Sequence, residues 1–110
     1  MTNHIPKPSW PDALQAFTNR NAGRVTILDE QGSDIGAQQA ERGYPLRGVS
    51  YDHHDQRIEI MLGDLNGTEH HFTRGIPNVT GIDVLSVDGR DAALRIQREG
   101  GQTILRFPGA

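Results

Sequence analysis

The 110-residue chain contains no cysteine, which excludes disulfide bonds, thiolate nucleophiles and cysteine zinc sites. Long hydrophobic runs are also missing. The longest run of Val, Ile, Leu, Met and Phe is Ile60-Met61-Leu62, which is too short for a membrane-spanning helix. The first residues have neither the basic start nor the apolar stretch of a secretion signal. We therefore expect a cytoplasmic protein that does not bind or cross a membrane.

A strong excess of positive charge is absent as well. The chain has 11 Lys and Arg against 14 Asp and Glu, a formal net charge of -3, with the two signs interspersed. Nucleic-acid binding driven by phosphate neutralisation needs a basic stripe. The only local basic excess, formed by Arg95, Arg98 and Arg106, is interrupted by Glu99. We expect no nucleic-acid partner.

One helix is predicted near the start of the chain, over about residues 10–20. Ser9 is a suitable N-cap and Pro11 suits the first turn. The apolar residues that follow have the i, i+3, i+4, i+7 spacing of one helix face; they are Trp10, Ala13, Leu14 and Phe17. This short amphipathic helix should pack its aromatic side chains on a sheet.

From residue 24 onward the hydrophobic pattern alternates with period two. Turn signals recur about every eight to twelve residues, Asn66-Gly67 and Asp88-Gly89 among them, and this spacing is typical of antiparallel sheets. The sequence predicts one domain over residues 1–110 in the α+β class, mostly β. Its short N-terminal helix precedes a curved antiparallel meander of about seven strands over residues 24–107. The meander is strongly curved or partly closed into a barrel. Residues 40–48 are predicted to form a loop, because proline at position 45 is unsuited to a central strand.

The alternation also predicts the core. Ile58, Ile60 and Leu62 share one strand face, and Leu94 and Ile96 share another. On the last strand, Leu105 with Phe107 is favoured as the inward pair over Ile104 with Arg106. The other expected core residues are Val25, Ile27, Val49, Tyr51, Phe72, Ile82 and Val84.

Two His-His pairs, His53-His54 and His70-His71, suggest a metal site between residues 50 and 73. A zinc ion needs three or four converging ligands, and neighbouring residues of a strand point to opposite faces. Pairing about Asn66 sets His71 near Ile60, about 10 Å from the first turn. We therefore interpret these histidines as parts of a turn and a strand end, and expect no metal and no cofactor. The alternative is an enzyme or metal-dependent binder that uses these strands; its site would comprise His54, His71, Asp52, Asp55 and Glu69.

No hydrolase elbow and no phosphate-binding loop occurs in the sequence, so no catalytic residue is assigned. The expected function is a non-catalytic binding module that contacts another protein or copies of itself. Tyr44 is a contact candidate in the expected loop, with the alternative that it folds back over the core. The remaining candidate contact residues should face away from the core; they are Arg57, Glu59, Met61 and His71.

Several short stretches together resemble a known family. They are Ile5, Pro6 and Trp10, and residues 34–38, 45–52, 58–63 and 92–107. The sequence resembles a bacterial family built on a domain of unknown function of the DUF5335 type. The resemblance implies a small bacterial protein with no established activity, cofactor or catalytic residues, and therefore assigns no site.

Overall fold

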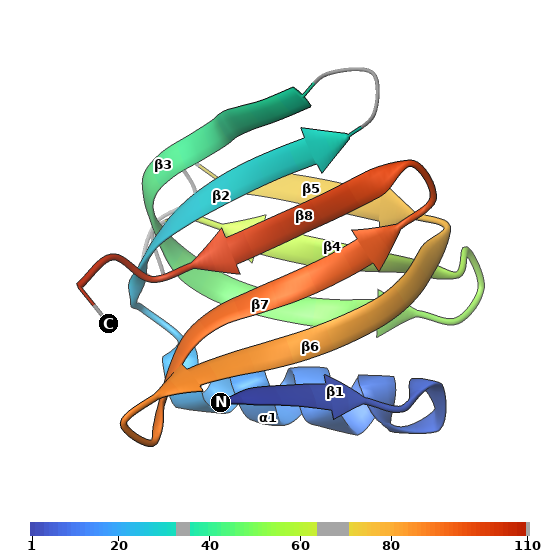
Figure 1. Ribbon diagram of the computed structural model, residues 1–110, viewed down its shortest axis with the longest axis horizontal. Helices are drawn as coiled ribbons and strands as arrows, with labels where there is room; N and C mark the ends of the chain where they lie inside the picture. The colour runs from blue at the N-terminus through green and yellow to red at the C-terminus, as the bar shows by residue number, and fades with distance from the viewer. Residues whose placement is uncertain (33–35, 64–70, 110) are drawn as a thin grey trace.

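The computed structural model describes residues 1–32, 36–63 and 71–109. Strand β1 (Thr2–Ile5) comes first, followed by the 3-10 turn η1 (Lys7–Ser9) and helix α1 (Trp10–Asn21). The other strands are β2 (Val25–Gly32), β3 (Gly36–Asp52), β4 (Arg57–Leu62), β5 (Phe72–Pro77), β6 (Val79–Val87), β7 (Arg90–Arg98) and β8 (Gly101–Arg106) (Figure 1). The predicted short N-terminal helix is confirmed.

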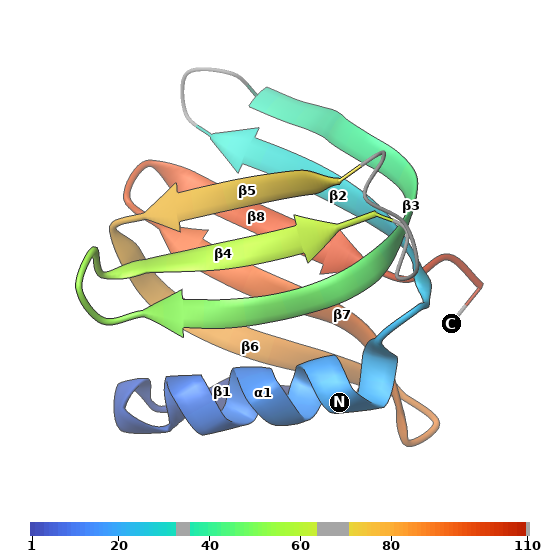
Figure 2. The same ribbon diagram turned by 180° about the vertical axis from the view of Figure 1, so that it is seen from behind.

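The strands form one antiparallel sheet in the order β1-β6-β7-β8-β2-β3-β4-β5. The sheet folds over, so that β4 and β5 lie behind β7 and β8 (Figures 1 and 2). It does not close, because β1 and β5 remain the two ends of the strand order. The predicted class, a mostly β fold with one short helix and a strongly curved antiparallel sheet, is confirmed.

Strand β3 is the bend of this sheet. Its first part pairs with β2 and its second part, from Leu46 onward, pairs with β4. The loop expected over residues 40–48 is therefore wrong, since those residues belong to one 17-residue strand. Pro45 is tolerated because it lies where the β2 ladder ends in a bulge, so its missing N–H leaves no ladder bond unmade. Its carbonyl still accepts a hydrogen bond from Gly63.

Strand β1 was not expected from the sequence. It has four residues, of which only Ile5 is buried, so it has too little alternation to be recognised. Pairing with β6, from Thr2 opposite Leu85 to Ile5 opposite Ile82, makes it a strand. A non-local partner decided the structure of this segment.

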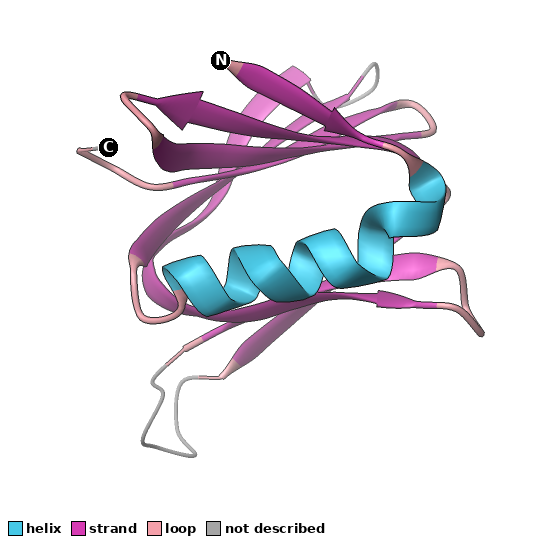
Figure 3. Ribbon diagram, turned by 90° about the horizontal axis from the view of Figure 1, so that it is seen from below, coloured by secondary structure: helices cyan, strands magenta, loops and turns pink. Residues whose placement is uncertain are grey.

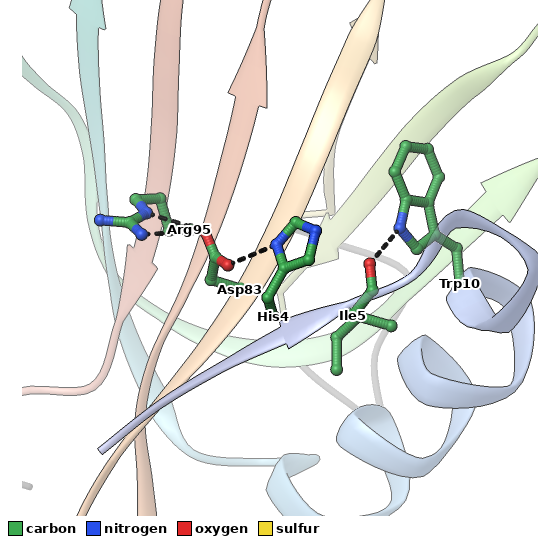
Figure 4. Close-up of polar contacts among 5 residues, drawn as sticks. All are labelled: His4, Ile5, Trp10, Asp83 and Arg95. Carbon is green, nitrogen blue, oxygen red and sulfur yellow. Dashed lines mark hydrogen bonds and ion pairs between the residues drawn. The ribbon is translucent and has the colours of Figure 1, made fainter.

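Helix α1 lies between β1 and the second part of β3, with the β1 and β6 layer on one side and the β3 and β4 layer on the other (Figure 3). The Thr18 hydroxyl accepts a hydrogen bond from the Val49 N–H at 2.9 Å and donates one to the Val49 carbonyl at 3.2 Å. On the other side, Trp10 Nε1 donates to the Ile5 carbonyl at 2.9 Å (Figure 4). The helix thus satisfies backbone groups that a further strand would otherwise pair.

The predicted core is confirmed at most positions. Buried as expected are Trp10, Phe17, Ile27, Val49, Ile58, Ile60, Leu62, Ile82, Val84, Leu94, Ile96, Leu105 and Phe107. Tyr51 and Phe72 are half-buried and pack against this cluster. The prediction that Val25 is a core residue is wrong, because 49% of its surface is exposed. In β2 the even-numbered residues Thr26, Leu28 and Glu30 point inward, which leaves Val25 and Ile27 on the other face. Ile27 is buried there, apart from the main apolar cluster, and Val25 is exposed at the strand's first position.

Gly101 generates a stability prediction. A Cβ atom at this position would lie 2.1 Å from the Gln31 carbonyl oxygen and 2.8 Å from the Gly32 Cα. These are backbone atoms of β2 that cannot move without breaking the β2–β8 ladder. We expect Gly101→Ala to lower the free energy of unfolding by about 3 kcal/mol, measured by urea denaturation.

Gly100→Ala is the adjacent control. A Cβ atom there meets nothing within 4 Å, and only the positive φ of 81° opposes it. Its expected cost is about 1 kcal/mol. Equal losses in the two variants would show that the close approach of β8 to β2 is not what requires glycine at position 101.

Candidate functional site

The outward side chains of β4 are the first residues that the sequence predicted for contact. Arg57, Glu59 and Met61 alternate with the buried Ile58, Ile60 and Leu62, so they lie on the outer face, where each is half-buried. Arg57 Nη2 lies 2.8 Å from Glu59 Oε1. The charges of Arg57 and Glu59 therefore neutralise each other in an ion pair along the strand.

Tyr44 is half-buried and packs against the core cluster. Its carbonyl accepts a hydrogen bond from the Thr26 hydroxyl at 2.7 Å. This arrangement matches the alternative in which the side chain folds back over the core.

The turn between β3 and β4 holds the first histidine pair. Asp52 Oδ1 accepts hydrogen bonds from the backbone N–H groups of His54, at 2.9 Å, and Asp55, at 3.4 Å. The bond from His54 is the main reason that the pKa of Asp52 lies below its usual value. A metal ion that used this oxygen would have to replace the bonds that hold the turn.

His71 does not lie where the sequence placed it. The β4–β5 register sets Arg74, not His71, opposite Ile60, and Phe72 opposite Leu62. The expected pairing would have turned His71 into the core, whereas the observed one faces Phe72 and Ile76 inward, and hydrophobic burial decides between registers. His71 is thereby separated from the first turn by the whole of β4, about 20 Å at strand rise.

The His71 side chain contacts the Arg47 guanidinium. Glu69 and His70 lie outside the described residues. Within residues 1–32, 36–63 and 71–109, no three His, Asp or Glu side chains are grouped as a metal ion would require.

A different polar cluster faces the interior, and the sequence reasoning missed it. Four strands each carry one polar residue in line with their inward apolar residues; these are Glu30 on β2, Arg74 on β5, Arg98 on β7 and Thr103 on β8. Glu30 Oε2 accepts hydrogen bonds from the Thr103 hydroxyl at 2.8 Å and from Arg98 Nη2 at 3.1 Å. Arg74 Nη2 lies 3.0 Å from Glu30 Oε1. We call this four-residue cluster the mouth.

The mouth borders a cavity of about 240 Å³, and its rim includes Asn78 and Glu99. Only 5% of the Glu30 side chain is exposed, while Arg74 and Arg98 retain 42% and 21% exposure. A carboxylate buried this deeply is tolerated only with charged partners, and the two guanidiniums supply them. With Glu99 included, the formal charges around the cavity are two positive and two negative.

Glu30 Oε1 distinguishes the mouth from an ordinary buried ion pair. Among the described residues, no group donates a hydrogen bond to this buried oxygen. The Arg74 nitrogen is near enough for ionic attraction but does not approach with hydrogen-bond geometry. Buried acceptors are nearly always satisfied, so this oxygen is open to a further donor beyond the described residues.

The sequence does contain a signal for the mouth. Glu30 follows Leu28 by two positions and Arg98 follows Ile96 by two, so each charge lies on an inward face. The strand pattern alone cannot show that such positions on four strands meet. That convergence depends on β5 folding beneath β2 and β8.

A second cluster lies on the outer face of the sheet, across β1, β6 and β7. Asp83 Oδ1 is 2.8 Å from His4 Nδ1, and its Oδ2 accepts hydrogen bonds from Arg95 at 2.9 and 3.1 Å (Figure 4). Burial alone would raise the pKa of Asp83, but the bonds to His4 and Arg95 outweigh burial and hold that pKa below its usual value. His4 is 67% exposed, so this carboxylate anchors an open histidine ring.

The lowered pKa of Asp83 predicts how stability depends on pH. A carboxyl group with a lower pKa in the folded chain than in the unfolded one stabilises the fold when ionised. Its contribution is complete above the unfolded value of about 3.8 and is lost as the pH falls through the lower folded value. Asp83→Asn should therefore reduce stability by about 1–2 kcal/mol at pH 7. The difference in the free energy of unfolding between wild type and Asp83→Asn, measured by urea unfolding, should shrink as the pH falls from about 5 to about 2.

Asp88→Asn, in the exposed turn between β6 and β7, is the control and should follow the wild-type pH profile. The prediction would be contradicted if the free energies of unfolding of wild type and Asp83→Asn differed by a constant amount below about pH 4, which is roughly the pKa of an unfolded carboxyl group.

These features define a small antiparallel β-sheet protein with a helix in the opening of its sheet and a polar cavity at one end of its strands. The chain belongs to a family of unknown function, DUF5335, whose family model matches residues 1–109. No curated protein and no solved structure matched the chain. In the described part of the chain, no helix has both the length and the apolar character that crossing a bilayer demands.

Proposed function

We propose that this protein is a non-catalytic binding module and that its ligand occupies the cavity bordered by the mouth. The observation that carries the proposal is Glu30 Oε1, a buried carboxylate oxygen beside a cavity of about 240 Å³ that receives no hydrogen bond from the described residues. A ligand that donates an N–H or O–H group to this oxygen would remove an energetic deficit already present in the fold.

The charges at the mouth indicate the chemistry of the ligand. Glu30 offers an acceptor, while Arg74 and Arg98 offer guanidinium donors that are partly exposed. The formal charges around the cavity cancel, which favours a neutral or zwitterionic molecule over a strongly charged one. The volume corresponds to roughly eight water molecules at about 30 Å³ each, so the ligand is small.

The same groups favour binding over catalysis. Arginine stays protonated at physiological pH and does not transfer protons. The Thr103 hydroxyl donates to Glu30 Oε2, and that same oxygen also accepts a hydrogen bond from Arg98. Groups of this kind recognise polar molecules by fixed hydrogen bonds.

Binding at the mouth can be tested by NMR titration of the untagged protein with free amino acids and small neutral amides. We expect saturable shifts in the backbone signals of β2, β5, β7 and β8 near the mouth. Glu30→Gln should weaken binding by about tenfold or more, because it removes a charge-assisted hydrogen bond of about 1.5–3 kcal/mol.

Glu59→Gln makes the same change of charge on the outer face and is the matched control. It should bind as the wild type does. Equal affinity of wild type and Glu30→Gln would contradict the proposal. Native mass spectrometry of protein purified without added ligand would report any small molecule that the protein retains.

Contact with a protein partner or a second copy is a separate proposal, and it concerns the outer face of β4. Arg57, Glu59 and Met61 lie there beside β5, which is the last strand in the order of the described sheet and pairs only with β4. A sheet edge next to a mixed polar and apolar face is suited to strand pairing between copies. His71 precedes β5 and borders the same edge.

For self-association we expect a dimer in analytical ultracentrifugation of the wild type and a monomer for Met61→Lys, which places a charge on the contact face. Val87→Lys introduces the same charge on the exposed turn side of β6 and should leave the dimer intact. A wild type that is monomeric at high micromolar concentration would remove homo-oligomerisation from consideration.

The metal-dependent or catalytic alternative has weaker support. The observed register keeps His54 and His71 at opposite ends of β4, and Asp52 is engaged by its own turn. We further propose a bacterial, cytoplasmic protein without a nucleic-acid partner, on the grounds of the family resemblance and the acidic net charge.

A further inference from the structure

A second pocket lies at the other end of β7 from the mouth. β7 begins at Arg90 and ends at Arg98, and Arg98 belongs to the mouth. Around Arg90, the turn between β6 and β7 meets the segment in which α1 ends (Figure 1). The residues here enclose a cavity of about 170 Å³; they are Arg20, Asn21, Arg24, Gly89, Arg90 and Asp91.

Asp91 fixes one wall of this pocket. Its Oδ2 atom accepts hydrogen bonds from Arg20 Nε and from the Asn21 side-chain amide, both at 2.8 Å. Arg24 Nη1 donates to the Asp91 carbonyl and to Asn21 Oδ1, also at 2.8 Å. The Arg24 guanidinium lies 4.0 Å from the centre of the Phe107 ring. Arg20 and Arg24 are thus held in place while some of their donors remain unused.

The positive charge in the pocket is not balanced by its own residues. Three guanidiniums face one carboxylate, a formal sum of +2. Burial first, and then repulsion from Arg90, lowers the pKa of Arg24, while Asp91 acts in the opposite direction. Keeping these like charges together costs free energy that no acidic side chain lining the cavity recovers.

Arg90 is the residue that local structure does not explain. Arg20 lies in the last turn of α1, where the helix dipole favours cations, Arg24 lies between α1 and β2, and both are bonded to Asp91. Arg90 belongs to a β-hairpin. Within the part of the chain that the structure describes, its guanidinium has neither a hydrogen bond nor an ion pair. All five of its N–H donors are available to a ligand.

We propose that this pocket binds a phosphate group in its doubly charged form, held by Arg20, Arg24 and Arg90. A dianion neutralises a formal charge of +2, whereas a carboxylate neutralises half of it. The guanidinium fork matches the oxygen spacing of phosphate, and three forks from different elements suit a tetrahedral ion. The cavity equals roughly five or six water molecules at about 30 Å³ each, enough for an ion of five heavy atoms.

This proposal does not depend on the mouth. The two cavities share no residue, and their charge sums differ, near zero at the mouth and +2 here. A protein that fails to bind amino acids at the mouth would still be expected to bind phosphate at this pocket.

The test is an NMR titration with inorganic phosphate at constant ionic strength and at a pH above the second pKa of the free ion, where the doubly charged form predominates. Chloride and acetate serve as comparison anions, and phenyl phosphate as a monoester. We expect saturable shifts of the Arg20, Arg24 and Arg90 side-chain Nε–H signals with phosphate. Arg90→Ala should weaken binding by about tenfold, without loss of the fold, because no hydrogen bond or ion pair to another described residue holds the Arg90 side chain.

Arg42→Ala is the matched control, because Arg42 is an exposed arginine on β3 and its loss changes the net charge equally. It should bind phosphate as the wild type does. Equal weakening by Arg42→Ala and Arg90→Ala would overturn the proposal, as would the same response to chloride as to phosphate, or no saturable shift. Tighter binding of phenyl phosphate would support the site and assign it to a phosphorylated molecule; tighter binding of inorganic phosphate would support it and assign it to the free ion.

Discussion

The hydrogen bonds between the Thr18 hydroxyl and the backbone of Val49 are the interaction on which this architecture depends. At Leu46 strand β3 leaves β2 for β4, so one edge of its second part has no strand beside it. An uncovered edge would expose unpaired N–H and C=O groups. Thr18 forms hydrogen bonds with both the N–H and the carbonyl of Val49, and Trp10 donates a hydrogen bond to the carbonyl of Ile5 on β1. The helix can then bury Leu14 and Phe17 in the space that the folded sheet leaves.

The local pattern of the sequence was enough to predict the elements whose structure is decided locally. Period-two alternation predicted β4, β7 and β8 and the faces that they bury, and the apolar face from Trp10 to Phe17 predicted α1. The errors concern partners. β1 is a strand because β6 lies beside it, Pro45 is accepted because a bulge falls there, and His71 moved because burial of Phe72 sets the register. None of these choices can be read from neighbouring residues alone.

The candidate site shows the same division. Charged residues at inward positions, such as Glu30 two places after Leu28, are visible in the sequence as exceptions to the apolar pattern. Their meaning is not, because Glu30 and Thr103 are 73 positions apart and meet only through the β2–β8 pairing. The residues that the sequence singled out, the clustered histidines, were conspicuous by composition. Arg90 was not singled out, and Arg98 was noted only as part of a basic excess, yet they lie in the two cavities at the ends of one strand.

The pairing of β2 with β8 also determines when β2 can complete its ladder during synthesis of the chain. Ile27 lies opposite Arg106, so a strand near the beginning of the chain completes its ladder only after about 79 more residues have been added. At about 5–20 residues per second, β2 waits roughly 4–16 s on the ribosome with one edge unpaired. Its Asp29, Glu30 and Gln31 are polar, which makes that waiting strand a poor template for aggregation. The carboxylate that shapes the mouth in the folded protein thus protects the nascent chain before the fold exists.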